Sequence, residues 1–252
     1  MQNPSITLIG AGPGDPELIT VKALRALERA EVVLYDALVN PALLDLVPEG
    51  APLIPVGKRA GQPSARQEDI NRRLVEMALV YGHAVRLKGG DPMLFARGSE
   101  EWAYAAEVGI PVSVIPGISS LQLPGLYGIP ITARGINTGV RVVTATNRFG
   151  ELTDELRHAA EDGQPTIVFM GLRRVAEIAR EYARHGHEDL PVAVISQGSL
   201  PTAQVVYGTL STLPGQLEAQ PVPAPGLLVI GETVAQAPAW AAWVAAQNKI
   251  PA

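Results

Sequence analysis

Residues 5–36 read SITLIGAGPGDPELITVKALRALERAEVVLYD. This segment begins and ends with short apolar runs. Between them, a glycine-rich turn precedes a stretch in which Leu18, Val21, Leu24 and Leu27 recur every three residues. Apolar runs of this length are typical of buried strands, and the recurrence indicates a helix with one apolar face. A strand, a helix and a second strand in this order predict a crossover unit of a parallel sheet.

The same alternation of apolar runs and amphipathic stretches continues along the chain. Further strands are predicted at 84–88, 111–116, 140–145, 166–170, 191–196, 203–208 and 227–231. Helices are predicted at 67–81, 98–108, 151–161 and 172–185. About ten strands are many for one open sheet in a chain of 252 residues. We therefore predict an α/β protein of two α/β lobes with mainly parallel sheets, residues 1–133 and 134–252, joined around 128–139.

The overall composition narrows the class of protein. The chain carries a net charge of −5 and no cysteine, and 47% of its residues are hydrophobic. The aliphatic content excludes a disordered chain, the acidic balance disfavours a nucleic-acid binder, and the lack of cysteine excludes disulfides and thiolate metal sites. No apolar run reaches about 18 residues and the first residues do not resemble a signal peptide, so we expect a cytoplasmic protein without a membrane span.

The loop that follows the first strand, GAGPGDP at 10–16, either brings backbone close to a ligand or forms a tight turn into the helix. A dinucleotide-binding loop is one interpretation, because Asp36 ends the second strand where that motif has a ribose-binding acid. However, Asp15 stands where the motif has its third glycine, and Pro13 and Pro16 remove amide donors. Binding of a nicotinamide cofactor is therefore the less favoured interpretation.

Three more loops each follow a predicted strand. VGKRAG at 56–61 is followed by Arg66, KGGDP at 88–92 leads to Arg97, and VIPGISS at 114–120 ends in two hydroxyls that either cap a helix or face a ligand. In parallel α/β folds, ligands bind beyond the carboxyl ends of the strands. Together the loops favour a shared site with a local positive charge, whereas each alone is compatible with an ordinary solvated loop.

A known family carries the same loops in the same order. The chain resembles the tetrapyrrole methylases, most closely their uroporphyrinogen-III C-methyltransferase branch, through GAGPGDP, YDALV, VGKRAG, VRLKGGDPMLFARGSEE, VIPGISS and GIPIT. The resemblance covers nearly the whole chain. It implies a cleft between the lobes that binds S-adenosylmethionine (SAM), a homodimer, and no metal. The implied reaction methylates C2 and C7 of uroporphyrinogen III, giving precorrin-2 through precorrin-1 and leaving S-adenosylhomocysteine.

The resemblance also implies roles for individual residues. Asp36 matches the proton acceptor, and Lys58 matches the proton donor. The positions that match SAM contacts are Pro13, Gly89, Gly90, Asp91, Leu94, Ser119, Ser120, Met170 and Gly198. The positions expected to bind the tetrapyrrole are Arg59, Arg66, Arg97, Glu100 and Arg134. The cations among them have an electrostatic task, because the implied substrate is a polycarboxylate.

The sequence departs from the family pattern at several positions on the substrate and methionine side. These positions are Ala96, Ser99, Ser119, Ser120, Ala133, Ala145 and Thr146. Two alternatives therefore stay open: a methyltransferase acting on a different tetrapyrrole or corrin precursor, and a SAM- or tetrapyrrole-binding homologue with little catalysis. The pathway that uses the product, whether sirohaem, cobalamin or haem d1 synthesis, also stays open.

Overall fold

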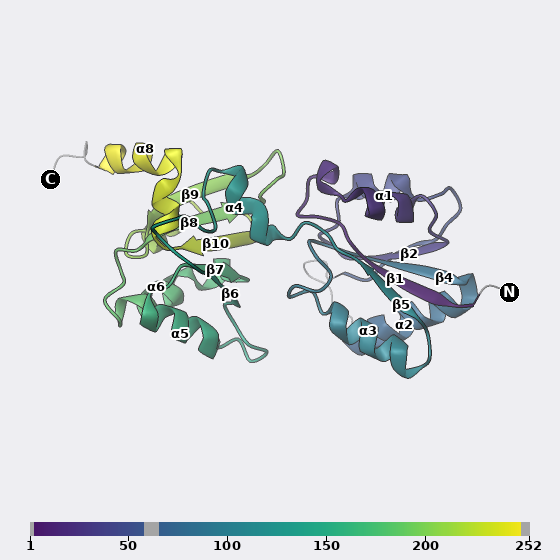
Figure 1. The fold of residues 1–252 in the computed structure, drawn as a ribbon. Coiled ribbons are helices and arrows are strands. Elements are labelled where there is room, and N and C mark those ends of the chain that lie inside the picture. Colours follow the sequence, from purple (N-terminus) through teal and green to yellow (C-terminus); the bar gives the residue numbers. More distant parts are fainter. Residues whose placement is uncertain (1–2, 58–65, 248–252) are drawn as a thin grey trace. The chain divides into compact units, whose positions relative to one another are not determined.

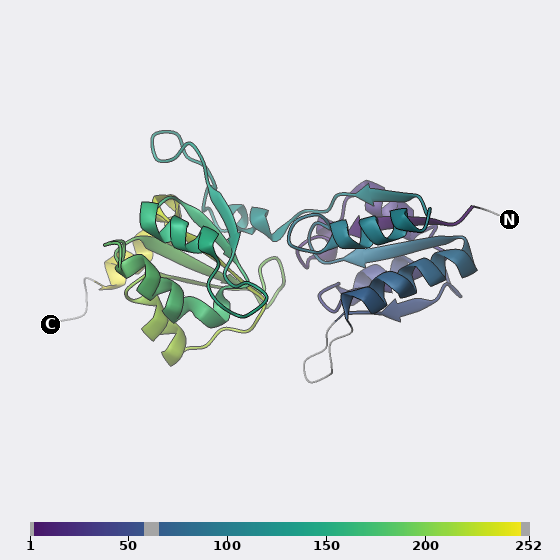
Figure 2. The same cartoon turned by 90° about the horizontal axis from the view of Figure 1, so that it is seen from below.

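The chain forms two compact units, Met1–Ser120 (unit 1) and Leu121–Ala252 (unit 2), in a computed structural model that describes residues 3–57 and 66–247 (Figures 1 and 2). The sequence places the division between residues 133 and 134, whereas the units divide after Ser120. The reason is packing: Leu123 and Ile129 are buried in the same apolar cluster as Ile195 of the second sheet.

Unit 1 contains a five-stranded sheet in which every strand pair is parallel. Its strands are β1 (Ser5–Gly10), β2 (Val32–Tyr35), β3 (Leu53–Pro55), β4 (His83–Lys88) and β5 (Val112–Ile115). They lie in the order β3-β2-β4-β1-β5, so the carboxyl ends of all five strands meet at one edge. The parallel sheet predicted from the alternation of strands and helices is confirmed for this unit.

Helices cover both faces of this sheet. Figure 1 shows α1 (Val21–Leu27) on one face and α2 (Gln67–Tyr81) and α3 (Gly98–Glu107) on the other. Side chains alternate across the strands, so Leu8 packs with α2 whereas Ile9 packs with α1. The bounds of α2 are those predicted from the sequence. The helix predicted from the recurrence of Leu18, Val21, Leu24 and Leu27 begins only at Val21, because a 3-10 turn at Pro16–Leu18 precedes Thr20, whose hydroxyl caps α1.

Unit 2 contains a second five-stranded sheet, which is mixed. Its strands are β6 (Arg141–Thr144), β7 (Thr166–Phe169), β8 (Pro191–Ser196), β9 (Gln204–Thr209) and β10 (Gly226–Ile230), in the order β6-β7-β10-β8-β9. Only β6 and β7 pair in parallel. Mainly parallel pairing is therefore not found here, because the short connection from β8 to β9 reverses the chain and β10 inserts antiparallel between β7 and β8.

Helices also pack on the second sheet. They are α4 (Leu123–Leu126), α5 (Asp154–Asp162), α6 (Val175–Ala183), α7 (Leu213–Ala219) and α8 (Pro238–Gln247). Short 3-10 turns lie at Pro41–Leu46, Ser120–Gln122, Leu172–Arg174 and Glu232–Gln236. In α8, the rings of Trp240 and Trp243 stack with centroids 4.8 Å apart. Within residues 3–57 and 66–247, no helix combines the length and the apolar character needed to cross a bilayer.

Candidate functional site

The loops after β1, β4 and β5 pack backbone against backbone at the carboxyl edge of the first sheet. The amide of Gly90 donates to the carbonyl of Gly12 at 2.7 Å, and the amide of Gly12 donates back at 3.3 Å. A Cβ on Gly117 would lie 2.3 Å from the carbonyl oxygen of Gly90, and a Cβ on Gly10 would lie 2.4 Å from Gly117. A Cβ at these two positions would collide with neighbouring backbone, so only glycine lets the three loops approach each other this closely.

The side chain of Asp91 connects two of these loops by hydrogen bonds. Its Oδ1 accepts a hydrogen bond from the amide of Met93 at 2.8 Å, and its Oδ2 accepts one from the amide of Gly117 at 3.1 Å. The aspartate therefore joins the loop after β4 to the loop after β5. The positions of unit 1 that match SAM contacts all lie in these loops: Pro13, Gly89, Gly90, Asp91, Leu94, Ser119 and Ser120.

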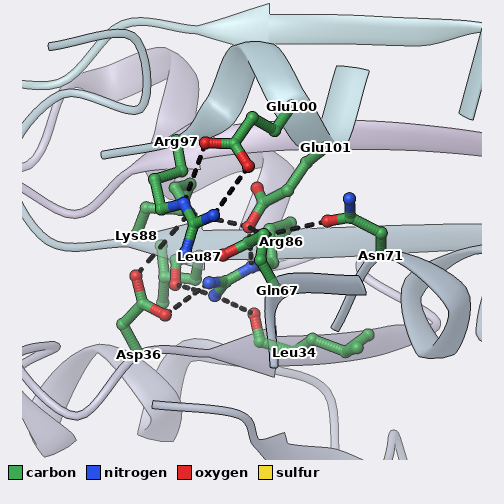
Figure 3. A network of polar contacts seen from close by, with 10 residues as sticks. All are labelled: Leu34, Asp36, Gln67, Asn71, Arg86, Leu87, Lys88, Arg97, Glu100 and Glu101. Atoms are coloured by element: carbon green, nitrogen blue, oxygen red, sulfur yellow. Dashed lines mark hydrogen bonds and ion pairs between the residues drawn. The ribbon is translucent and has the colours of Figure 1, made fainter. Parts of the chain in front are cut away.

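A network of charged side chains lies beside these loops (Figure 3). Arg86 on β4 forms an ion pair with Asp36, which follows β2, and its Nε donates to Oε1 of Glu101 on α3 at 3.0 Å. A second bond from Arg86 reaches the carbonyl of Leu87 at 3.1 Å. The side chains of Arg86 and Glu101 are 2% and 0% exposed, whereas that of Asp36 is 28% exposed. Asp36 thus presents the solvent-facing carboxylate of an otherwise buried network.

Lys88 completes the network two residues further along β4. Its Nζ lies 2.8 Å from Oε1 of Glu101 and 3.8 Å from Oδ2 of Asp36. Burial lowers the pKa of Lys88, and repulsion from Arg86 lowers it further, while the charges of Glu101 and Asp36 oppose this change. Two cations and two carboxylates therefore share one site, and the charges balance.

A single carboxylate oxygen of Glu101 accepts hydrogen bonds from three side chains. Its Oε1 accepts from Arg86, from Lys88 and from the amide of Gln67 at 3.2 Å, and Gln67 also donates to Asn71 at 2.9 Å. Its Oε2 is buried, and no residue in the described part of the chain donates a hydrogen bond to it.

Sequence reasoning did not identify Arg86, Lys88 and Glu101 as functional residues. A signal is present, because two cations two residues apart on a strand point to the same face. On an otherwise apolar strand, two buried cations on one face require a buried carboxylate as their partner. Which of the two adjacent glutamates supplies that partner depends on where the following helix begins.

Arg97 and Glu100 form a separate, exposed pair beside the network (Figure 3). The guanidinium of Arg97 donates from Nε and Nη2 to the two carboxylate oxygens of Glu100, both at 2.8 Å. This hydrogen bonding raises the pKa of Arg97 and lowers the pKa of Glu100. Arg97 adopts a left-handed backbone with φ of 61°, as does Phe95 with φ of 53°. Such conformations are strained for residues other than glycine and cluster at ligand sites.

The structure describes two of the other predicted tetrapyrrole-binding residues. Arg66 is exposed at the start of α2, and Arg134 is exposed in unit 2. Lys58 and Arg59 lie outside the described residues. Asp36, Arg97 and Glu100 are thus the predicted catalytic and substrate residues that the structure places in or beside the network.

The predicted adenosine-side residues lie at one edge of the second sheet. Met170 follows β7 and Gly198 follows β8, and these two strands run in the same direction on either side of β10. Met170 has a left-handed φ of 56° and a side chain that is largely exposed. Gly198 is buried, and a Cβ there would lie 2.8 Å from side-chain atoms of Ile195 and Leu123.

A cavity of about 310 Å³ lies among residues that follow β7 and precede β10. Its lining residues are Leu172, Arg173, Leu217, Pro221, Val222 and Ala224. Most of these side chains are apolar, and Leu172 comes two residues after Met170 in the chain. The edge of unit 2 therefore carries a mainly apolar depression close in sequence to Met170.

Comparisons with known proteins identify relatives over most of the chain. Residues 5–214 match the family described as Tetrapyrrole (Corrin/Porphyrin) Methylases. The uroporphyrinogen-III C-methyltransferase of Paracoccus denitrificans is 43% identical over 92% of this chain and 82% of its own length. Siroheme synthase 2 of Aeromonas hydrophila is 44% identical over 91% of this chain, and the chain spans about half the length of that relative.

A solved structure has the same fold. The uroporphyrin-III C-methyl transferase of Thermus thermophilus, complexed with S-adenyl homocysteine, is 38% identical and superposes with a TM-score of 0.79. The match covers 91% of this chain and 98% of that one. The matched family, the sequence identity and the shared fold together show that this chain belongs to the tetrapyrrole methylase family.

Proposed function

We propose that this protein transfers methyl groups from SAM to C2 and C7 of uroporphyrinogen III, giving precorrin-2 through precorrin-1. The observation that carries the proposal is the Asp36 carboxylate, partly exposed and paired with Arg86 and Lys88 beside the glycine loops. An acceptor for the proton that a porphyrinogen carbon loses needs this combination of access and fixed orientation. The identity to the Paracoccus denitrificans enzyme supports the same substrate.

The glycine loops of unit 1 fit SAM as the methyl donor. Gly10 and Gly117 let these loops pack backbone against backbone, which holds the residues that match SAM contacts close together at this edge. In this proposal, Pro13, Gly89, Asp91, Leu94, Ser119 and Ser120 line the methionine and ribose end. Met170 and Gly198 contact the adenosine end from unit 2, where the exposed thioether side chain and the apolar cavity suit an adenine ring.

The proposed reaction is a direct displacement. A pyrrole carbon supplies the electron pair of the new carbon–methyl bond, the sulfur–methyl bond breaks, and its electron pair stays on sulfur as S-adenosylhomocysteine forms. Asp36 then takes the proton that the methylated ring loses, which returns the ring to neutrality. Lys58 is the proposed proton donor where a ring atom is reprotonated, and each proton it gives is balanced by one more that Asp36 removes. Arg97, Arg59, Arg66 and Arg134 bind the propionate and acetate groups of the ring, because guanidinium groups pair well with carboxylates. Glu100 contributes at the tetrapyrrole side by orienting Arg97 through their two hydrogen bonds.

The test is an anaerobic incubation of the protein with SAM and enzymatically prepared uroporphyrinogen III. We expect products heavier by one and two methyl groups, and no mass gain would refute the proposal. Asp36→Asn should lower turnover about 100-fold or more, as expected for loss of a general base, while the Kd for SAM stays within about twofold. Asp69→Asn, an exposed aspartate on α2, is the matched control.

A parallel incubation with later corrinoid intermediates tests substrate choice. We expect faster methylation of uroporphyrinogen III, and a clear preference for a corrinoid would replace the proposed substrate. Tight SAM binding by calorimetry without turnover on either substrate would instead indicate a binding protein.

We also propose that the protein acts as a cytoplasmic homodimer. The proposal rests on the family resemblance and on the lack of cysteine, which is compatible with a reducing compartment. Light scattering on the purified protein should give twice the chain mass of 26.6 kDa. A monomer mass at assay concentrations would contradict the dimer.

A further inference from the structure

Three side chains form a buried charge cluster in unit 1, namely Arg86, Lys88 and Glu101. Their side chains are 2%, 3% and 0% exposed. Burying charges costs several kcal/mol of desolvation per ion, and well-packed apolar residues often replace such a set without loss of stability. Their presence in the core of a small sheet therefore points to a use other than stability.

Among the charged side chains of the network in the described part of the chain, Asp36 is the one that reaches the solvent-facing surface. Arg86 and Lys88 both reach Asp36, and Asp36 is the member of the network that solvent reaches. On the opposite side, both cations converge on Oε1 of Glu101, at 3.0 and 2.8 Å. Glu101 thus lies behind the two cations that hold Asp36, and its own carboxylate is shielded from solvent and from any ligand at this edge.

We propose that Glu101 is a positioning residue for the methyl transfer, acting on Asp36 through Arg86 and Lys88. The proposal rests on the proposed function of Asp36. Glu101 keeps two like charges side by side on β4 and offsets one of them, so Asp36 is held by fixed cations while the network stays neutral. Without Glu101, the cations repel each other and a net positive charge remains beside Asp36.

The distribution of donors on Glu101 favours a positioning role, because no residue in ranges 3–57 and 66–247 donates a hydrogen bond to its buried Oε2. A carboxylate selected only for stability would have donors on both oxygens, because a buried oxygen without a donor costs about 1–3 kcal/mol. Here all three donors gather on Oε1, the oxygen that faces the cations. The neighbouring Glu100 differs in this respect, because each of its two oxygens accepts a hydrogen bond from Arg97 at the surface.

The experiment compares Glu101→Gln with Glu181→Gln. Both remove the charge of a glutamate that is at most about a tenth exposed, but Glu181 pairs with Arg184 in unit 2, far from the network in sequence. Glu101→Gln should lower kcat about tenfold or more with the KM for SAM within about twofold. Glu181→Gln should leave both unchanged.

The pH profile separates positioning from loss of structure. Because Glu101→Gln removes one negative charge from a neutral network and leaves one uncompensated positive charge beside the carboxylate, the acidic limb of its pH–kcat profile should move to lower pH by about one unit. Glu101→Asp restores the charge and should return the limb to its wild-type position, even if turnover recovers only in part. A general loss of structure lowers turnover without moving the limb.

Several results would overturn the proposal. It fails if Glu101→Gln matches Glu181→Gln in kcat, or if kcat falls while the acidic limb stays in place. If Glu101→Gln does not fold, the charge-balanced pair Lys88→Met with Glu101→Gln replaces it, and wild-type turnover in that pair refutes the role. Lack of turnover in the wild-type protein refutes the proposed function instead, so the two failures are distinguishable.

Discussion

The two sheets have the same number of strands, but their cores differ in charge. The central strand β4 of unit 1 carries buried Arg86 and Lys88, whereas the central strand β10 of unit 2 reads GLLVI and is apolar throughout. The buried polar side chains on the described strands of unit 2 are the hydroxyls of Thr166 and Ser196. An aliphatic interior is therefore enough to build a five-stranded sheet covered by helices. We infer that the buried charges of unit 1 serve a purpose other than folding.

The largest loss of stability is expected where a buried charge of unit 1 is removed. Glu101→Leu leaves Arg86 and Lys88 buried without their shared partner, and we expect the free energy of unfolding to fall by about 3–5 kcal/mol. Thr166→Val in unit 2 removes one hydroxyl hydrogen bond to Gln164 and should cost only about 0.5–1.5 kcal/mol. Urea denaturation measures both, and equal losses would contradict the contrast.

The second prediction compares one glycine from each unit. An alanine Cβ at Gly117 meets backbone of Gly90 at 2.3 Å, whereas one at Gly198 meets side-chain atoms at 2.8 Å. Backbone cannot move aside without shifting the loops, so Gly117→Ala should cost about 3 kcal/mol and Gly198→Ala about 1 kcal/mol. The same denaturation experiment ranks the two, and a larger loss at Gly198 would reverse the interpretation.

The third prediction concerns the buried Tyr182 in unit 2. Burial raises the pKa of Tyr182 to about 12. The folded protein therefore keeps this proton between pH 10 and 12 while the unfolded chain loses it. This stabilisation is present below pH 10 and is lost as the pH rises to 12, by up to about 1.4 kcal/mol per pH unit.

Tyr182→Phe removes that dependence and supplies the check. Its buried hydroxyl has at best a weak contact with Thr166, so at pH 8 the stability of the variant should lie within about 1 kcal/mol of the wild type. Thermal unfolding from pH 8 to 11 measures both effects. An unchanged alkaline slope would show that another group is responsible.

The smallest expected effect lies at the surface of unit 1. Arg97→Gln breaks an ion pair whose side chains are 55% and 49% exposed, so we expect a loss of only about 0–1 kcal/mol. If Arg97 binds the tetrapyrrole as proposed, the KM for uroporphyrinogen III should nevertheless rise clearly. A large loss of stability with an unchanged KM would assign Arg97 to folding instead.

Much of the fold follows from periodicity in the sequence. The apolar stripe of residues 67–81 gives α2 with its observed bounds, because its apolar side chains recur at helical spacing against the sheet. Strand direction does not follow in the same way. The runs at 191–196 and 203–208 correctly indicate strands, but an apolar run has the same pattern in either direction, and the antiparallel pairing depends on a short connection.

The sequence likewise predicts some residues of the candidate site and not others. Asp36 was identified from its place after a strand and from the family resemblance, and both depend on local sequence. Glu101 is not identified by the sequence, because the adjacent Glu100 has the same side chain. Which of the two is buried depends on the residue at which α3 begins. The left-handed Arg97 sets where α3 begins, and such a backbone conformation is rare for arginine and is not indicated by its side chain.

The contact of Gly12 with Gly90 and of Gly10 with Gly117 has a consequence for engineering. These loops touch through main chain, so no change of side chain can compensate for a change in the path of any one of them. Replacing the loop after β4 with that of a homologue would leave the loops after β1 and β5 shaped for the old neighbour. Chimaeras that aim to alter donor or substrate choice must therefore exchange all three loops together, as a single inherited block.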